Sequence, residues 1–270
     1  MSNQLYIDLI KKVLIDYFRI DQTEYWPVKS NLFTKLLENT LFSLKRRKYK
    51  LCHERIYQLS ERIEGRDCPR YADTMIGLER LENIEYCFNE IISNNVPGDF
   101  LETGVWRGGA TIFMKALLKS ENIDDRNVWV ADSFEGLPKP NEKYKADKNS
   151  TFHNWPEMAI SLDSVKNNFN KYGLLDDKVI FLKGWFKDTL PSAQIKSISL
   201  LRLDGDMYES TRDALINLYP KLSIGGYILI DDYKTVSNCK QAVDDYRKQN
   251  NITEEILNAD WASIFWRKLK

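Results

Sequence analysis

The strongest indication of fold class in this sequence is Asp99-Phe-Leu-Glu-Thr-Gly-Val-Trp-Arg-Gly-Gly-Ala110. Its first four residues are typical of a short strand, and a helical pattern over 110–120 follows directly after the glycine-containing turn. The glycine spacing, G-x-x-x-G-G, differs from the G-x-G-x-x-G of dinucleotide-binding folds, and Trp106 and Arg107 fill the middle of the turn. We therefore expect this turn to face a nucleoside ligand that lacks a pyrophosphate.

Strand and helix patterns continue to alternate on the C-terminal side of this turn. Strands are expected at 99–102, 128–131, 179–182, 198–203 and 227–230, and helices at 110–120, 162–172, 210–219 and 240–250. Strands separated by helices pair in parallel, because a parallel crossover needs about a dozen residues or more. The last segments, 252–257 and 263–269, are typical of an antiparallel hairpin. The sequence therefore predicts an open α/β sheet, mostly parallel, with a C-terminal antiparallel hairpin.

Residues 1–95 have a helical pattern and are expected to form an N-terminal extension to the α/β part at 96–270. Apolar residues recur at helical spacing over 5–18, and further helices are predicted at 32–44 and 75–94. The apolar stripe on the first of these helices suggests contact between subunits, in a homodimer or a higher homo-oligomer.

Composition excludes several classes of protein. The 270 residues contain 39 Lys+Arg and 39 Asp+Glu, so no net charge attracts nucleic acid, and 12% aromatic residues exclude disorder. No apolar run is long enough to span a membrane, and charges interrupt any signal-peptide pattern at the N-terminus, so we expect a cytoplasmic protein. Four single cysteines and two histidines make a zinc site hard to assemble.

Acidic residues follow four of the five expected parallel strands. They are Glu102, Asp132, the pair Asp204 and Asp206, and the pair Asp231 and Asp232. Because the carboxyl ends of parallel strands meet at one edge of a sheet, these carboxylates would repel one another unless cations or hydrogen-bond donors offset their charge. Arg107 and Arg202 are the nearby cations. Asp132 is placed to accept both hydroxyls of a ribose, so with the glycine turn it describes an adenosine-type site.

The acids after the fourth and fifth strands predict a metal site, provided that the two strands are neighbours. Three or four oxygen ligands without Cys or His select a hard divalent ion, Mg²⁺ first, with Ca²⁺ or Mn²⁺ possible. Such an ion would lower the pKa of a substrate hydroxyl, and a further carboxylate could take the proton.

Two other functions fit parts of this pattern. Asp204-Gly-Asp206 also has the form of the DxD motif of metal-dependent glycosyltransferases, although Glu102 beside the glycine turn and the lack of a basic pair for a diphosphate argue against it. A nucleotide-sensing module without turnover is the second alternative.

Six motifs, in order along the chain, carry a family resemblance. They are Tyr71–Met75, Phe100–Gly109, Asp132–Pro138, Gly184–Pro191, Arg202–Thr211 and Asp231–Tyr233. With these motifs the sequence resembles the macrocin O-methyltransferase family, which methylates deoxysugar hydroxyls on antibiotics and other glycans, from about Leu5 to Arg267. The resemblance implies a class I methyltransferase (Rossmann-like) fold, S-adenosylmethionine as methyl donor, Mg²⁺ as the required ion, and a sugar or glycoside acceptor.

The resemblance also assigns roles by motif position. It implies that Asp204, Asp231 and Asp232 bind the metal and that Asp206 is the general base. It places the donor against Thr74, Met75, Glu102, Thr103, Gly104, Gly109, Ala110, Asp132, Ser133, Gly184 and Trp185, so that part of the donor site comes from residues 1–95. The polar segment 139–160 is long for a plain connection, and we expect a lid that carries acceptor specificity.

Overall fold

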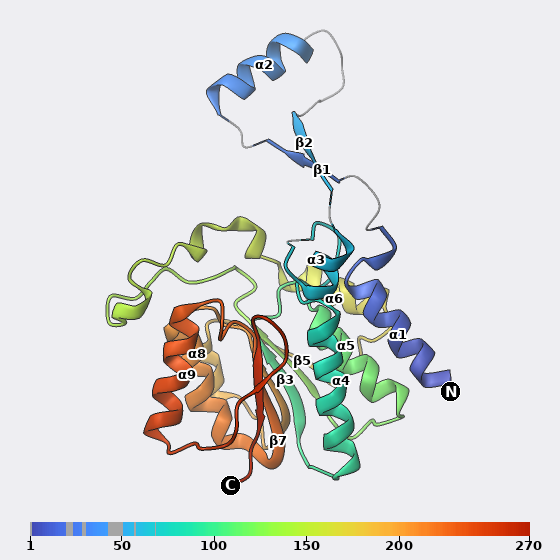
Figure 1. The fold of residues 1–270 in the computed structure, drawn as a ribbon, viewed down its shortest axis with the longest axis vertical. Helices are drawn as coiled ribbons and strands as arrows, with labels where there is room; N and C mark the ends of the chain where they lie inside the picture. Colours follow the sequence, from blue (N-terminus) through green and yellow to red (C-terminus); the bar gives the residue numbers. More distant parts are fainter. Residues whose placement is uncertain (1, 20–23, 29–30, 43–50, 57, 68) are drawn as a thin grey trace.

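A seven-stranded sheet forms the centre of the molecule, in the order β5-β4-β3-β6-β7-β9-β8. The structure is a computed structural model, and it describes residues 2–19, 24–28, 31–42, 51–56, 58–67 and 69–270 (Figure 1). The strands of the sheet are β3 (Asp99–Thr103), β4 (Val128–Asp132), β5 (Val179–Lys183), β6 (Ile198–Leu203), β7 (Leu222–Ile230), β8 (Leu257–Asn258) and β9 (Ile264–Arg267). The pairs among β3 to β7 are parallel, whereas β9 pairs antiparallel with both β7 and β8. The predicted mostly parallel α/β fold with a C-terminal antiparallel hairpin is confirmed.

Helices cover both faces of this sheet (Figure 1). The α-helices are α1 (Ser2–Leu14), α2 (Leu32–Phe42), α3 (Leu59–Glu64), α4 (Leu78–Ser93), α5 (Gly109–Ser120), α6 (Leu162–Lys171), α7 (Phe186–Thr189), α8 (Tyr208–Leu218) and α9 (Ser237–Gln249). Single turns of 3₁₀-helix are η1 (Tyr17–Arg19), η2 (Lys145–Asp147), η3 (Phe152–Asn154), η4 (Pro156–Met158), η5 (Leu190–Ser192) and η6 (Tyr219–Lys221). None of these described helices is long and apolar enough to cross a lipid bilayer.

The core has two halves, one on each face of the sheet. Phe100 of β3 points into the cluster formed with α1, α4, α5 and α6, and its neighbour Leu101 points into the cluster formed with α8 and α9. This is the alternation that a strand buried on both faces requires. Helix α4, which precedes residue 95, contributes fully buried Leu81 and Ile84 to the first cluster.

The N-terminal part departs from the purely helical expectation. Strands β1 (Glu24–Pro27) and β2 (Cys52–Arg55) pair antiparallel, and with α2 they stand apart from the main body (Figure 1). The helical expectation for residues 1–95 names no helix at these positions but misses the strands, which lack the alternating apolar pattern and include a proline. Positions 43 and 44 of the expected second helix lie outside the described residues.

The first strand of the expected C-terminal hairpin is also shorter than predicted. Only Leu257 and Asn258 pair with β9, and residues 252–256 form no strand. The carboxylate of Glu254 accepts hydrogen bonds from the backbone N–H groups of Thr253 and Leu269, at 3.0 and 3.3 Å. The side chain therefore takes donors that a strand ladder would use, which no apolar pattern reveals.

Candidate active site

The turn after β3 requires glycine where it meets two other segments. A Cβ on Gly104, which has φ +76°, would lie 1.7 Å from the carbonyl oxygen of Asp204. A Cβ on Gly109 would lie 2.4 Å from the carbonyl oxygen of Asp73 and 2.5 Å from Cβ of Thr74. The turn thus contacts both the loop after β6 and the N-terminal residues that sequence analysis assigned to the donor.

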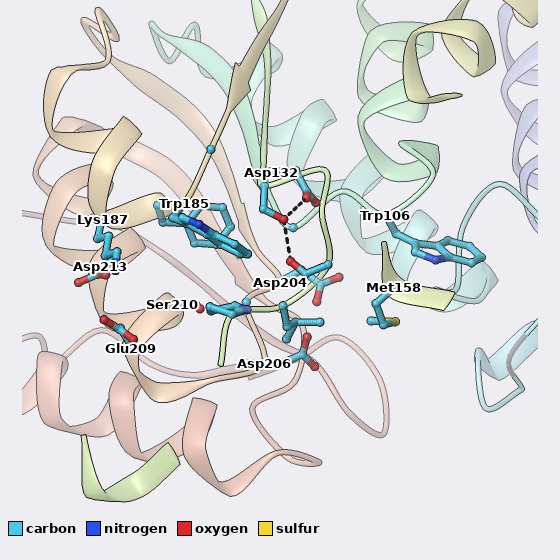
Figure 2. Close-up of a pocket in the computed structure, with 18 of the residues that line it drawn as sticks. Trp106, Asp132, Met158, Trp185, Lys187, Asp204, Asp206, Glu209, Ser210 and Asp213 are labelled. Carbon is cyan, nitrogen blue, oxygen red and sulfur yellow. Dashed lines mark hydrogen bonds between the residues drawn. The ribbon is translucent and has the colours of Figure 1, made fainter. Parts of the chain in front are cut away.

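Asp132, which lies at the end of β4 in the wall of the cavity drawn in Figure 2, fixes the shape of this turn. Its Oδ2 accepts a hydrogen bond from the backbone N–H of Val105 at 2.8 Å, and its Oδ1 accepts one from Phe134 at 2.7 Å. Burial raises the pKa of Asp132, while these backbone hydrogen bonds act in the opposite direction. Each carboxylate oxygen has a second lone pair, so Asp132 can organise the turn and still accept a hydrogen bond from a ligand hydroxyl.

Two adjoining cavities open beside these strand ends. The predicted site residues that line the first are Met75, Gly104, Asp132, Ser133, Gly184, Trp185, Asp204 and Asp206 (Figure 2). Those that line the second are Thr74, Met75, Glu102, Gly104, Ala110, Asp204, Asp206, Asp231 and Asp232. Of the predicted donor residues, Thr103 and Gly109 line neither: Thr103 is fully buried in β3, and Gly109 packs under residues 73 and 74. Asp204 and Asp206 lie where the two cavities meet.

Three carboxylates gather at this junction. Oxygen atoms of Asp204, Asp206 and Asp232 lie within 4.8 Å of one another, and strands β6 and β7 are neighbours, as the metal prediction required. Burial, with repulsion from the neighbouring carboxylates, raises the pKa of Asp204 to about 6 and that of Asp206 to about 8. The same causes raise the pKa of Asp232 well above its usual range.

Asp231 is bound differently, because two arginines hold its two oxygens. Oδ1 accepts a hydrogen bond from Arg202, and Oδ2 accepts one from Nη1 of Arg80 at 2.7 Å. Burial disfavours the charged carboxylate, but the two guanidinium groups hold the pKa of Asp231 below its ordinary value. Arg202 also donates to Glu102 and, at 3.0 Å, to Asp204. Burial is the main reason why the pKa of Glu102 rises to about 8.

Arg202 was expected from the sequence as a nearby cation, whereas Arg80 and its second partner, Asp260, were not. Nε of Arg80 donates to Asp260 at 2.7 Å, across 180 residues of sequence. Arg107, the other expected cation, donates to the carbonyl oxygen of Ala72 at 2.6 Å. Apolar periodicity places α4 against the sheet, but it does not say which polar residue reaches the sheet edge.

The segment 139–160 contains three 3₁₀ turns, and Asp147 fastens it to the start of α8. Both carboxylate oxygens of Asp147, which is fully buried, accept backbone N–H groups at the start of α8, from Tyr208 at 2.8 Å and from Glu209 at 2.9 Å. Further along, Met158 lines both cavities and half-exposed Trp155 lines the second.

The charges at this edge fit a divalent cation. Two guanidinium groups, from Arg80 and Arg202, face six carboxyl groups, those of Glu102, Asp204, Asp206, Asp231, Asp232 and Asp260. Oδ2 of Asp232 and Oε2 of Glu102 are buried without a hydrogen-bond partner. Hard oxygen ligands of this kind suit Mg²⁺, and the second unpartnered oxygen suits a ligand ammonium or hydroxyl.

The strand order, the glycine turn and the acidic strand ends together define a class I methyltransferase fold. The O-methyltransferase NovP has this fold, with a TM-score of 0.85 and 43% identity over 99% of this chain and 100% of that chain. The calicheamicin methyltransferase CalS11 shares the fold at a TM-score of 0.57 and 17% identity, over 89% of this chain and 95% of that one. A class I methyltransferase fold implies S-adenosylmethionine as the methyl donor.

The chain belongs to the macrocin-O-methyltransferase (TylF) family, whose model matches residues 3–268. Demethyldecarbamoylnovobiocin O-methyltransferase from Streptomyces niveus is 46% identical over 89% of this chain and 93% of its own. A tetracenomycin C 4'-O-methyltransferase from Streptomyces olivaceus, whose name specifies a 2,3-dimethoxy-alpha-L-rhamnosyl group, is 42% identical over 98% and 93%. Mycinamicin III 3''-O-methyltransferase from Micromonospora griseorubida is 40% identical over 98% and 96%. The resemblance drawn from the six motifs is confirmed, and O-methyl transfer takes precedence over the glycosyltransferase alternative.

Proposed function

We propose that this protein transfers a methyl group from S-adenosylmethionine to a hydroxyl of a sugar or glycoside, with Mg²⁺ and an aspartate base. The observation that carries the proposal is the junction of the two cavities, where Asp204 and Asp206 lie between a nucleoside-type pocket and a second, larger space. The names of the family relatives support a glycosidic acceptor.

The first cavity would bind the nucleoside end of the donor. Asp132 would accept the ribose hydroxyls, and Gly184 with Trp185 would contact the adenine. Glu102, whose Oε2 has no protein partner, would accept a hydrogen bond from the ammonium of the amino-acid portion, beside Thr74 and Met75. Bound in this way, the donor would direct its reactive methyl group toward Asp206.

Asp204 and Asp232 would hold Mg²⁺, joined by Asp231 through the lone pairs that its two arginines leave free. When bound, the ion would lower the pKa of an acceptor hydroxyl. Asp206 takes the proton of the reacting hydroxyl at its carboxylate, and its burial, which raises its pKa, makes that carboxylate a stronger base than an exposed aspartate. The fixed carboxylates orient the acceptor, and orientation supplies much of the rate.

The test is a methylation assay with S-adenosylmethionine, Mg²⁺ and a panel of alkyl and aryl rhamnosides, read by mass spectrometry as the gain of one methyl group. We expect EDTA to abolish product. Asp206→Asn should lower kcat by about 10²- to 10⁴-fold and leave the affinity for S-adenosylhomocysteine unchanged.

The Asp206→Asn variant suits this test because asparagine tolerates the positive φ of 54° found at this position. Asp163→Asn, an exposed change on α6 that lines neither cavity, is the matched control and should retain kcat. Turnover that survives EDTA would contradict the metal role, and near-normal kcat in Asp206→Asn would contradict the base.

We also propose that the protein forms a homodimer or a higher homo-oligomer through its N-terminal part. Helix α1 buries Ile7, Ile10 and Leu14 within its own chain, but on α2 Leu32 is 87% exposed and Phe33 is 70% exposed. Exposed apolar residues grouped on one element favour contact with another subunit. Light scattering coupled to size exclusion should report more than one chain per particle. A monomer at all concentrations would refute the proposed oligomer.

A further inference from the structure

A buried carboxylate that the proposed mechanism does not use lies in the wall of the second cavity. The side chain of Asp67 is 1% exposed, and the residue lines this cavity. Its Oδ2 accepts a hydrogen bond from Nε of Arg62 at 2.5 Å, whereas its Oδ1 is buried without a partner. A buried acceptor that lacks a donor costs free energy, so such atoms usually meet a ligand or an ordered water. Asp67 therefore has one unused acceptor atom, Oδ1, in the wall of this cavity.

The orientation of this carboxylate is fixed by its partner. Arg62 is 3% exposed, and its Nη1 donates to the carbonyl oxygen of Ile15 at 2.6 Å. Because the guanidinium is held on two sides, the Oδ2 atom of Asp67 stays against it. Only Oδ1 remains for another donor, which makes Asp67 a directional contact.

Asp67 also lies close to the catalytic edge. Arg80 contacts Asp231 through Nη1 at 2.7 Å and the carbonyl oxygen of Gly65 through Nη2 at 3.5 Å. The turn that carries Asp67 is thus separated from the edge carboxylates by a single guanidinium group. Trp261 lines the same cavity, and its Nε1 donates to the carbonyl oxygen of Glu64 at 2.7 Å. The cavity therefore has carboxylates at two places and an indole ring fastened beside one of them.

The charges around Asp67 favour a neutral ligand group. Arg62 already pairs with its carboxylate, Arg55 and Arg80 line the same cavity, and the guanidinium of Arg66 lies 4.2 Å from the ring centre of Trp261. An ammonium group would add positive charge beside a carboxylate that Arg62 already neutralises, whereas a hydroxyl donates a hydrogen bond without adding charge.

We propose that Asp67 accepts a hydrogen bond from an acceptor hydroxyl that is not methylated, and that this contact selects which hydroxyl reaches Asp206. The inference rests on the proposed function, because it names the residue that would read the sugar in the same site. Asp67 is then a specificity-determining residue in the same cavity as Asp206.

The test compares binding of the rhamnoside that the wild type methylates, and of each of its monodeoxy analogues, to protein loaded with S-adenosylhomocysteine and Mg²⁺. Asp67→Asn should turn its amide N–H₂ toward the cavity, because only the amide oxygen can accept the hydrogen bond that Nε of Arg62 donates. Affinity for the parent rhamnoside should fall by about tenfold to a hundredfold. One monodeoxy analogue, the one without the contacted hydroxyl, should bind to the variant and the wild type equally.

Arg62→Gln is the matched control, since it removes the same ion pair but keeps the carboxylate of Asp67 in the cavity wall. Because Arg62 also orients that carboxylate, this variant should weaken binding of the parent rhamnoside less than Asp67→Asn does, and it should keep the wild-type order of affinities among the monodeoxy analogues. Unchanged discrimination in Asp67→Asn, or an equal loss in Arg62→Gln, would overturn the role of Asp67. A wild type that methylates no rhamnoside would instead count against the proposed function.

Discussion

Arg202 is the residue on which the charge balance of the site depends most directly. It is 3% exposed and donates to Glu102, Asp204 and Asp231, which belong to three different strand ends. A buried cation with three carboxylate partners contributes less by net attraction than by preventing uncompensated burial of the partners. Its loss should therefore be felt at the donor side and at the metal side together.

Arg202→Leu should lower the free energy of unfolding by about 3–5 kcal/mol, because it leaves buried carboxylates without their counter-ion. Urea denaturation with and without Mg²⁺ measures this, and the ion should restore part of the loss. The stability of Arg202→Lys, which keeps the charge but not the forked geometry, should lie between those of the wild type and Arg202→Leu. A leucine variant as stable as the wild type would show that the carboxylates are protonated without Arg202.

For single residues, the sequence predicted where the acids lie better than it predicted which side chains pair with them. The acids of the catalytic edge were predictable because parallel strands bring their carboxyl ends together, whatever helices intervene. Arg80 was not, because it meets Asp231 across 151 residues and sits on a helix whose pattern records only its apolar face. Asp67 was likewise hidden, since one acid in a turn carries no periodic signal.

Among the elements, the segment 139–160 is held more firmly than a free lid would be. Asp147 caps the start of α8, directly after Asp206, and Asn238 of α9 donates to the same carboxylate at 3.0 Å. The half of the segment near Asp147 is therefore an anchor, and the half that carries Trp155 and Met158 is the part exposed to the cavities.

Asp147→Ala should cost about 1–2 kcal/mol of stability through the lost cap and should open residues 139–150 to limited proteolysis. Ser161→Ala removes a cap of the same kind from α6, where the serine accepts from Ser164 N–H at 3.2 Å, and serves as the control. The control should lose stability without new cleavage in 139–150. Equal cleavage of both variants would show that the segment is not anchored by Asp147.

The sequence predicted the elements that depend on local signals and missed those that depend on contacts between distant residues. Helix α6 begins at Leu162 as expected, because a serine cap precedes a strong apolar periodicity. The pairing of β1 with β2 and the shortness of β8 depend on contacts between distant segments or on one carboxylate, so local propensity is not informative there.

The whole molecule should show a stability that depends on pH and on Mg²⁺ jointly. Without metal, the folded chain holds protons on Asp206 and Asp232 that the unfolded chain has released, because their pKa values are raised. This contribution is fully present below the unfolded aspartate pKa, near 4, and is lost as the pH rises toward about 8, the pKa of Asp206.

Melting temperatures in EDTA should therefore fall between about pH 6 and pH 8 more steeply for the wild type than for Asp206→Asn. Since Mg²⁺ would compete with protons for the carboxylates of Asp204 and Asp232, whose pKa values are raised, the gain in Tm on adding Mg²⁺ should be larger at about pH 8 than at about pH 6. A gain that does not change with pH would place the ion away from these residues.

The reach of Arg80 from α4 to Asp231 and Asp260 has a consequence for how such proteins can be recombined. The first ninety-five residues supply walls of the second cavity and also a counter-ion of the catalytic edge. A chimera that takes this segment from a relative would replace Asp67, the proposed contact to the acceptor, and Arg80, the counter-ion of Asp231, at the same time. Acceptor range and catalytic electrostatics are therefore linked traits in this chain, and cannot be exchanged one at a time at that junction.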